Sequence, residues 1–478
     1  MHGFPQRDFY GRAGGFCRFA EILVCYGTKM DYQQAWNYLD SLQFFKIKLG
    51  LDSMERFLGR LGDPQRRLRF IHVAGTNGKG SVAAALLSVL ARAGYRVGLY
   101  TSPHLSCVRE RFRINSDFIP EADFARQATA IHAVLDGEQI TYFEFTTALA
   151  LLWFAAAEVD VAIMEVGMGG RLDATNVITP LAGVITNVSL DHQAYLGDTL
   201  AAVASEKAGI IKPGVPLVSG VAADDSRRVV EERCRELAAP LYLLGRDFSW
   251  QAAGETAGAD ADTAQPLSAR AWTYRGLHGA IEGLNSPLRG SYQRDNLSLA
   301  LATLELLATS LPVGEQDIRA GLAAVSWPGR LELLELSWEE QGGQRRVLLD
   351  GAHNPAGVAA LVAALEADFT YRRLVMIWAS MADKDVAAGL NLIAPLCDTL
   401  ILTRPESERS AIPAEMRRLL APEARVRVLE AADPLAALDL AWRLSAAEDL
   451  VAVAGSLYLV GAARRILLGE LVAAVTRY

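Results

Sequence analysis

The chain has 478 residues, enough for two or three domains with large buried cores. Its hydrophobic content of 51% and charged content of 21% are ordinary for an α/β enzyme. The net charge is −8 and no block of like charges stands out, which argues against a nucleic-acid backbone or an anionic membrane as a partner.

Cysteine usage and apolar runs indicate the compartment. The cysteines are odd in number, scattered and without a CxxC motif, which disfavours a disulfide framework and a zinc site: Cys17, Cys25, Cys107, Cys234 and Cys397. The most apolar stretch, 145–157, is too short to span the ~30 Å of a bilayer core and predicts a buried helix. We therefore expect a cytoplasmic protein. Residues 1–29 lack the apolar core of a signal peptide, and we interpret them as a disordered tail or a start-site artefact.

The first ordered segment predicts two short amphipathic helices that pack over a nucleotide-binding domain. Apolar residues recur at helical spacing over 35–45 and again over 51–61. Between them, Lys46 and Lys48 are either solvated loop charges, the favoured interpretation, or contacts to an anionic substrate.

A glycine-rich turn follows a buried strand and precedes a helix. The apolar run 70–73 predicts the strand, and the small residues and helix formers of 82–93 predict the helix. In such a turn, backbone N–H groups and the helix dipole attract phosphate, while Lys79 reaches the outer phosphates. The loop departs from a standard P-loop because it is shorter and Gly80 separates the lysine from the serine. A glycine turn with an incidental lysine is the less favoured alternative. The candidate nucleotide-binding residues here are Gly75, Thr76, Asn77, Gly78, Lys79, Gly80 and Ser81.

Strand and helix then alternate, as in a doubly wound parallel sheet. Further apolar strands are predicted at 95–100, 161–166, 183–188 and 215–219. Ligands of such sheets gather at the carboxyl ends of the strands. Ser102, Glu165 and His192 occupy these ends, and together they indicate a Mg²⁺ site. Taken singly, each has an ordinary alternative: a turn cap for the serine, a pair with Arg171 for the glutamate and a satisfied turn histidine.

The second half of the chain predicts another α/β unit. Residues 245–290 read as an exposed loop with some β-hairpin, and 295–310 as a helix. A Trp-Pro-Gly-Arg sequence at 327–330 indicates a linker. Five strands are then predicted, at 347–349, 374–379, 399–403, 426–429 and 450–454, and the first ends in the polar sequence DGAHNP.

With these motifs in place, the chain closely resembles the folylpolyglutamate synthase and dihydrofolate synthase family, within the Mur ligase superfamily. The resemblance runs from about Met30 to the C-terminus and includes, in family order, SLQFFKIKLGL, HVAGTNGKGS, YTSPHL, TYFEFTT, EVGMGGRLDATN, the DH of SLDH, SEKAGIIK, WPGRLE, DGAHNP, MADKD and GSLYLVG. It departs from the family before DKD, where relatives often have a glycine in the strand, and over 245–288.

The resemblance implies an α/β fold in which a P-loop-containing, doubly wound parallel-sheet ATPase domain (30–326) is joined by a linker (327–333) to a smaller Rossmann-like C-terminal domain (334–478). It implies an ATP-dependent ligase that joins L-glutamate to dihydropteroate, to reduced folates or to both, through an acyl phosphate. Phosphorylation removes the negative charge that makes a carboxylate a poor electrophile and supplies a good leaving group.

The resemblance also assigns roles to residues. The expected Mg²⁺ ligands are Ser102, Glu165 and His192. Lys207 is expected to be carbamylated and, in that form, to help bind a second Mg²⁺. The imidazole of His192 is proposed as a ligand on the resemblance alone, since Mg²⁺ prefers oxygen. The alternative for Lys207 is an ordinary lysine paired with Glu206. Besides the P-loop, the expected ATP contacts are Asn296, Arg330, Asp350 and His353, so that nucleotide lies between the domains. The expected catalytic residues are Lys79, His192, Lys207, Asp350 and His353, and the expected pterin-binding residues are Thr141, Leu172, Asp173 and Ala174. Thr141 also reads as a helix cap whose capping box is closed by Glu144.

Two other functions are weighed against this one. A Mur-type ligase for a cell-wall peptide would need the UDP-binding domain that is missing here, and the LDATN segment speaks against it. A P-loop switch protein would not need the glutamate, histidine, lysine and aspartate of the expected site together. We expect a monomer that binds small molecules, and no nucleic acid or membrane; the sequence leaves open whether a monovalent cation is required.

Overall fold

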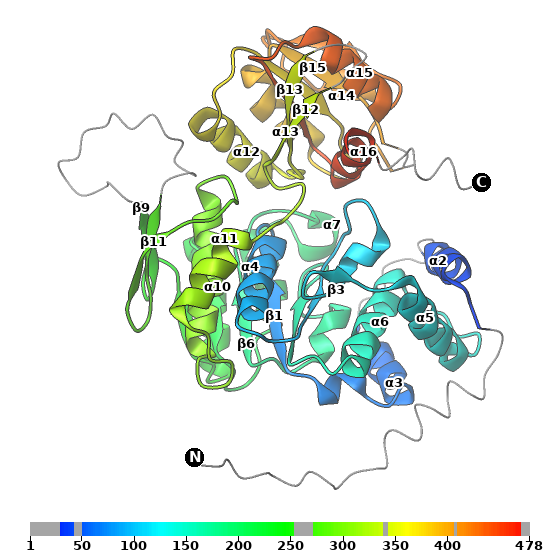
Figure 1. Ribbon diagram of the computed structural model, residues 1–478, viewed down its shortest axis with the longest axis vertical. Helices are drawn as coiled ribbons and strands as arrows, with labels where there is room; N and C mark the ends of the chain where they lie inside the picture. The colour runs from blue at the N-terminus through cyan, green and yellow to red at the C-terminus, as the bar shows by residue number, and fades with distance from the viewer. Residues whose placement is uncertain (1–28, 43–49, 253–270, 338–342, 406–408, 470–478) are drawn as a thin grey trace, which may run out of the picture.

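The computed structural model describes residues 29–42, 50–252, 271–337, 343–405 and 409–469. It consists of a larger N-terminal domain, blue to green in Figure 1, and a smaller C-terminal domain above it, yellow to red. Residues 1–28 of the predicted tail, Lys46 and Lys48 lie outside the described residues.

The N-terminal domain is built on an eight-stranded sheet whose central strand leads into the glycine-rich loop. Its order is β4-β3-β2-β5-β1-β6-β7-β8, and the strands from β2 to β8 are parallel. The parallel strands are β1 (Phe70–Ala74), β2 (Val97–Tyr100), β5 (Val161–Glu165), β6 (Ala182–Ile185), β7 (Leu217–Ser219) and β8 (Leu241–Leu243). Every residue of β1 is buried, as expected for a strand with neighbours on both sides and helices on both faces.

One edge of this sheet differs from the predicted all-parallel arrangement. Strands β3 (Phe112–Ile114) and β4 (Asp117–Phe118) form a short antiparallel hairpin beside β2. Asn115 makes the tight turn between them with a φ of 52°. This hairpin was not predicted, because its strands are only three and two residues long and carry too little periodicity to be recognised.

Helices cover both faces of the sheet, which is the doubly wound arrangement that the sequence predicts. One face packs against α4 (Lys79–Arg92), α10 (Tyr292–Leu306) and α11 (Glu315–Ala324), which lie together in Figure 1. The other face packs against α2 (Tyr32–Ser41), α3 (Asp52–Arg60), α5 (Glu121–Leu135) and α6 (Tyr142–Ala156). The predicted buried helix over 145–157 is confirmed as α6. In the described part of the chain, no helix combines the length and apolar character needed to cross a bilayer.

The remaining elements of this domain lie toward the other edge. They comprise α7 (Gln193–Leu196), α8 (Leu200–Ala208), α9 (Asp224–Glu236) and a separate antiparallel sheet of β9 (Ser249–Ala252), β10 (Trp272–Arg275) and β11 (Ala280–Leu284). The sequence predicted a loop with some hairpin here, so the third strand is an addition.

The C-terminal domain has a six-stranded sheet in the order β12-β13-β17-β14-β15-β16. The five predicted strands are confirmed as β13 (Gln344–Leu349), β14 (Leu374–Trp378), β15 (Thr399–Leu402), β16 (Arg427–Glu430) and β17 (Leu450–Ala454). The antiparallel edge strand β12 (Glu332–Ser337) was not predicted, and its first two residues fall within the expected linker 327–333. One face carries α12 (Pro355–Asp368), α13 (Val386–Ile393) and α14 (Pro413–Arg418), and the other carries α15 (Pro434–Leu444) and α16 (Leu457–Leu467).

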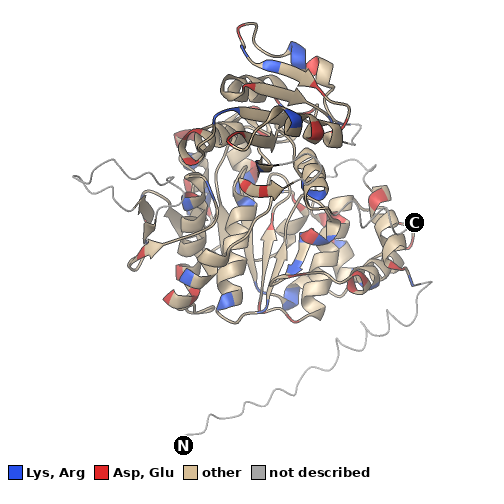
Figure 2. Ribbon diagram, turned by 45° about the horizontal axis from the view of Figure 1, so that its top comes forward, with Lys and Arg blue, Asp and Glu red and all other residues tan. Residues whose placement is uncertain are grey.

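Charged residues are distributed over both domains. In Figure 2, basic and acidic residues are interspersed along the helices, with no extended region of one sign in this view. This distribution agrees with the sequence, in which charges of both signs alternate without long runs.

Candidate active site

The glycine-rich loop joins β1 to α4 in the predicted strand–turn–helix arrangement. Helix α4 begins at Lys79, three residues earlier than expected, and Gly78 is its N-cap with a φ of 83°. A Cβ at Gly78 would lie 2.3 Å from Oδ1 of Asn296, and one at Gly80 would lie 2.5 Å from the ring of Trp327. The loop therefore requires glycine at these two positions, which brings its backbone close to α10 and to the interdomain connection.

Hydrogen bonds fasten the loop to the segment that follows β6. The backbone N–H of Asn77 donates to Oδ1 of Asn187 at 3.0 Å, and the amide of Asn187 donates back to the Asn77 carbonyl at 3.0 Å. The Thr186 hydroxyl donates to the same carbonyl at 2.6 Å. Thr76 exchanges hydrogen bonds with the backbone of Ser189. The loop is thus held in a fixed shape, as backbone N–H groups that bind an anion must be.

Lys79 is half-buried and folds back over the loop. Its ammonium donates to the carbonyls of Gly75 and Thr76, at 3.0 and 3.1 Å. Burial lowers the pKa of this amine, while the carboxylates of Glu165 and Asp191 act in the opposite direction. A lysine in this position can supply positive charge to the outer phosphates of a nucleotide, as the sequence predicts.

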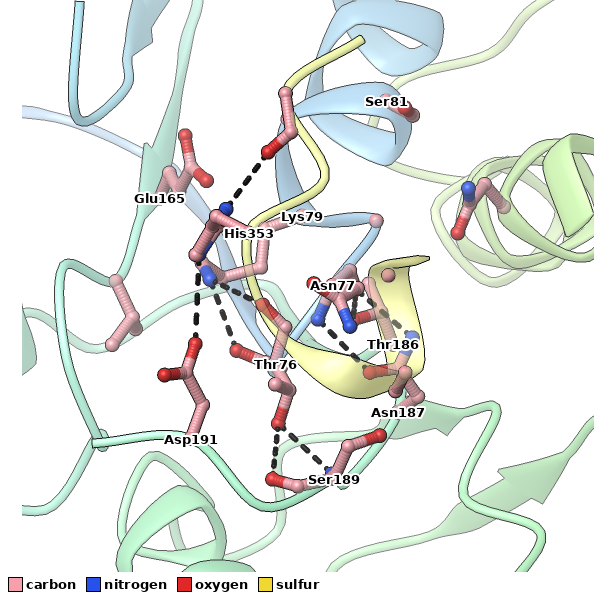
Figure 3. Close-up of a pocket in the computed structure, with 18 of the residues that line it drawn as sticks. Thr76, Asn77, Lys79, Ser81, Glu165, Thr186, Asn187, Ser189, Asp191 and His353 are labelled. Carbon is pink, nitrogen blue, oxygen red and sulfur yellow. Dashed lines mark hydrogen bonds and ion pairs between the residues drawn. The ribbon is translucent and has the colours of Figure 1, made fainter. Parts of the chain in front are cut away.

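The loop forms the floor of a cavity of about 370 Å³ that both domains line. Figure 3 shows loop residues, Glu165 and Asp191 around this cavity with His353 of the C-terminal domain. Its walls include most of the residues expected from the sequence: the whole stretch 75–81, Ser102, Glu165, His192, Lys207, Asn296, Arg330, Asp350 and His353. The structure brings these residues together around one cavity between the domains, and their individual roles stay predictions.

Glu165 and Ser102 lie together at the ends of neighbouring strands. The backbone N–H of Ser102 donates to Oε2 of Glu165 at 3.2 Å. Burial raises the pKa of the Glu165 carboxyl, against the opposing charges of Lys79 and Arg330. The alternative partner considered from the sequence, Arg171, instead forms an ion pair with Glu206 at 2.8 Å. Glu165 is therefore a buried carboxylate facing the cavity.

Lys207, on α8, is also buried and faces the cavity. Burial lowers the pKa of its amine to about 7, and the nearby charge of Lys79 contributes to the same shift. The expected alternative, a pair with Glu206, is not formed, because Glu206 pairs with Arg171. At neutral pH a substantial fraction of this amine is consequently unprotonated and nucleophilic.

Asp191 and His192 form contacts between the two domains at the cavity wall. Asp191 accepts a hydrogen bond from the side-chain amide of Asn354 at 3.0 Å and lies 2.5 Å from the ammonium of Lys384. Burial alone would raise the pKa of Asp191, but the contact with the His353 ring and the positive charge of Lys384 hold it well below its usual range. Burial lowers the pKa of His192 to about 4, so this imidazole is neutral at neutral pH.

The C-terminal domain contributes the sequence DGAHNP at the end of β13. Asp350 accepts from the backbone N–H groups of Leu331 and Ala352, both at 2.9 Å, which ties the interdomain connection to this loop. Burial raises the pKa of the Asp350 carboxyl, opposed by the charge of Arg330. His353 lies with Nδ1 2.8 Å from the Gly351 carbonyl, which makes Nδ1 the protonated nitrogen and directs Nε2 toward Asp191, 3.6 Å away.

The expected pterin-binding residues do not line this cavity. Thr141 is the N-cap of α6, and the predicted capping box with Glu144 is confirmed. Asp173 is buried and accepts hydrogen bonds from the N–H groups of Gly167 and Met168, both at 3.0 Å. It also accepts from the Thr175 hydroxyl at 2.5 Å, and Thr175 contacts Nε2 of the buried His72 at 2.9 Å. Because Gly167 and Met168 line the cavity, Asp173 supports its wall from behind.

Sequence reasoning assigned no role to several residues of the site. Thr186 and Asn187 hold the loop, and Asn354 and Lys384 reach Asp191 from the other domain. Asn354 and Lys384 belong to the motifs DGAHNP and MADKD, so the motif was visible but the cross-domain contact was not. The described residues contain no cluster of three His, Cys, Asp or Glu side chains suited to a metal ion, and the expected ligand set itself includes a serine and a lysine.

Comparisons with known proteins agree with this architecture. The Mur ligase middle domain matches residues 73–304, and the Mur ligase glutamate ligase domain matches residues 329–457. Folylpolyglutamate synthase of Lacticaseibacillus casei is 37% identical over 432 residues, covering 86% of this chain and 93% of that protein. Dihydrofolate synthase/folylpolyglutamate synthase of Escherichia coli is 32% identical over 425 residues, covering 89% and 92%.

A solved structure gives the same result in three dimensions. The structure of Escherichia coli FolC in complex with DHPP and ADP superposes with a TM-score of 0.81 at 30% identity, covering 92% of this chain and 99% of that one. The resemblance that the motifs indicated is confirmed over most of the chain. The chain is a ligase and belongs to the folylpolyglutamate synthase and dihydrofolate synthase family of Mur ligases.

Proposed function

We propose that this protein uses ATP to join L-glutamate to both dihydropteroate and reduced folates. The observation that carries the proposal is the cavity between the domains, in which a phosphate-binding loop faces buried Glu165 and Lys207 on one side and Asp350 and His353 on the other. A site divided in this way suits a reaction in which three substrates must be brought together and shielded from water.

The reaction that we propose has two steps. A carboxylate oxygen of the acceptor attacks the γ-phosphorus of ATP, so that ADP leaves and an acyl phosphate forms. The amine of glutamate then attacks the acyl carbon, and phosphate leaves as the amide forms. Both steps develop negative charge on oxygen, and positioned positive groups stabilise that charge.

The residues of this chain supply positioning and charge. Lys79 and the N–H groups of the loop hold the phosphates, with the helix dipole of α4 behind them. Arg330 lies in the cavity near Asp350 and Glu165 and adds a second positive group from the interdomain connection. Asn296 lines the same wall beside Gly78. We propose that Asp350 and His353 orient the nucleotide from the C-terminal domain.

A divalent cation of the Mg²⁺ type fits the donors at this site. Glu165 offers a buried carboxylate, Ser102 a hydroxyl, and His192 a neutral imidazole, all on the cavity wall. Mg²⁺ prefers oxygen donors and shares its coordination with phosphates, so the carboxylate is the principal protein ligand. When bound, the cation neutralises charge on the phosphates and orients them.

We further propose that Lys207 is carbamylated and contributes to a second cation site. Carbamate formation requires an unprotonated amine, and burial of this side chain favours that form near neutral pH. The product is an anion with two oxygen donors, which suits Mg²⁺ better than an amine does.

The acceptor is proposed to bind near α6 and the loop after β5, where Thr141, Leu172, Asp173 and Ala174 lie. Escherichia coli FolC, which shares this fold, binds DHPP together with ADP, and this supports a second small-molecule substrate beside the nucleotide. Asp173 orders the backbone of the 167–168 turn, which borders the cavity.

The test is phosphate release by the purified protein with Mg-ATP and L-glutamate, comparing dihydropteroate, a reduced monoglutamyl folate and no acceptor, with mass spectrometry of the products. One added glutamyl unit on both acceptors supports the proposal. Addition to folate alone restricts the protein to polyglutamylation. If neither acceptor raises phosphate release above the background measured without acceptor, ligation of these substrates is refuted.

A pair of variants locates the site. Lys79→Ala should abolish product formation, because it removes the charge held over the phosphate loop. Arg228→Ala, on the exposed surface of α9, is the matched control and should behave as the wild type. Unchanged activity of Lys79→Ala would mean that ATP is bound elsewhere.

A further inference from the structure

A lysine of the C-terminal domain reaches across the domain boundary to the expected cation site. Lys384 lies in the connection between β14 and α13, in the sequence MADKD. Its Nζ is 2.5 Å from Oδ1 of Asp191 and 3.3 Å from Nε2 of His192. The side chains of Lys384 and Asp191 are only 10% and 9% exposed. The contact is therefore a largely buried ion pair that also includes an imidazole.

The chemistry of the groups fixes the direction of the contact with His192. A lysine ammonium has three N–H donors and no lone pair, so it can only donate. Nε2 of His192 must accept, which places the ring proton on Nδ1. A ring nitrogen has one lone pair, and that of Nε2 is engaged by Lys384. The same lone pair cannot bind a metal cation at the same time.

The ion pair is part of a larger set of contacts that converge on Asp191. Asn354 donates to Oδ2 of Asp191, and Nε2 of His353 lies 3.6 Å from the same oxygen. Both residues, like Lys384, come from the C-terminal domain, whereas Asp191 and His192 follow β6 of the N-terminal domain. Displacement of the lysine therefore breaks a contact between the two domains.

We propose that Lys384 is a positioning residue that occupies the Nε2 lone pair of His192 in the cation-free protein, so that a cation binds at His192 only after Lys384 withdraws with its loop. The ammonium thus acts as an internal substitute for the cation, and the position of the C-terminal domain controls occupancy of the site. This inference rests on the proposed function, because the cation role of His192 belongs to that proposal.

The test measures binding of Mn²⁺ alone, as a paramagnetic substitute for Mg²⁺, to the full-length, nucleotide-free protein by electron paramagnetic resonance. Lys384→Met keeps the apolar part of the side chain and removes the charge. It should bind Mn²⁺ at least about tenfold more tightly than the wild type, because in the wild type Lys384 must first leave its ion pair with Asp191. Even with water-like screening, two opposite unit charges ~3 Å apart attract each other with an energy that corresponds to about a tenfold change in affinity. Lys212→Met, which removes a lysine that contacts Asn176 away from the cavity, should leave Mn²⁺ affinity unchanged.

Two further variants identify the cause. Lys384→Ala should repeat the gain if the methionine variant folds poorly. Adding His192→Ala to Lys384→Met should remove the gain, since it takes away the proposed ligand. Equal Mn²⁺ affinity in the wild type and in both Lys384 variants would overturn the inference, as would a gain that survives loss of His192.

The inference and the proposed function fail separately. If the wild type ligates glutamate but the Lys384 variants bind Mn²⁺ no more tightly, the inference alone falls. If the variants bind Mn²⁺ more tightly through His192 but the wild type adds no glutamate to either acceptor, the inference holds and the proposed function falls.

Discussion

Substitution of Gly78 by alanine tests the geometry of the phosphate loop. This residue has a φ of 83° and lies at the start of α4, with Oδ1 of Asn296 2.3 Å from where a Cβ would be. Alanine in the left-handed region costs ~1–2 kcal/mol. Crowding in a packed site costs a further ~1–3 kcal/mol, because Asn296 is buried and has little space to move. We therefore expect Gly78→Ala to lower the free energy of unfolding by ~2–5 kcal/mol.

Gly137 provides a matched control for the backbone part of this cost. Its φ is 84°, and no atom lies within 4 Å of the position of its Cβ. Gly137→Ala should therefore lower the free energy of unfolding by only ~1–2 kcal/mol.

The assay is urea unfolding of both variants, together with ADP binding by calorimetry. Gly78→Ala should also bind ADP at least about tenfold more weakly, since the loop N–H groups and Asn296 must shift, whereas Gly137→Ala should bind it normally. Equal destabilisation and equal ADP affinity in the two variants would refute the argument that the loop needs glycine because of its contact with α10.

Further predictions concern buried polar groups in the cavity wall and behind it. The pKa of Lys207 is about 7 in the folded protein, against about 10.4 for an exposed lysine. Between pH 7 and 10 the unfolded chain therefore binds a proton at this residue that the folded chain does not, and the free energy of unfolding rises with pH. In bicarbonate-free buffer, Lys207→Met should show a smaller rise in unfolding free energy from pH 7 to 9 than the wild type; an equal rise would contradict the burial argument. Thr175→Val removes the hydroxyl between Asp173 and His72 and should cost ~1–3 kcal/mol by urea unfolding. The double variant with His72→Leu should cost less than the sum of the two single variants, and additive costs would show that the hydroxyl and the imidazole act independently.

The phosphate loop shows what local sequence can predict. The apolar run before Gly75 predicted β1 correctly, because a fully buried parallel strand is a continuous run of apolar residues without alternation of polar and apolar positions. The start of α4 was placed three residues late, since Lys79 and Gly80 read as part of the turn. The first turn of α4 contains Gly80 because the ring of Trp327 lies too close to leave space for a side chain at this position. Trp327 is 247 residues further along the chain, so local sequence could not reveal this contact.

The rule that ligands gather at strand ends also predicted part of the site. Ser102 follows β2 and Glu165 ends the adjacent parallel strand β5, and the structure brings them within hydrogen-bonding distance. Lys207 lies on a helix, so no strand-end argument reaches it, and only the family resemblance identified it.

Contacts between the domains were beyond sequence reasoning. Lys384 and Asp191 are 193 residues apart, and neither a periodicity nor a turn signal relates them. The edge strands β3, β4 and β12 were missed for a related reason, because strands this short or this exposed are determined by the neighbours they pair with rather than by their own residues.

The division of the cavity has a consequence for the use of ATP. The phosphate loop belongs to one domain, whereas Asp350 and His353 belong to the other, and Arg330 lies on the connection between them. If Asp350, His353 and Arg330 contact ATP as proposed, each domain alone carries an incomplete set of the groups that hold the nucleotide. We expect separation of the two domains to slow ATP hydrolysis, so that nucleotide bound without an acceptor is protected from breakdown to ADP and phosphate.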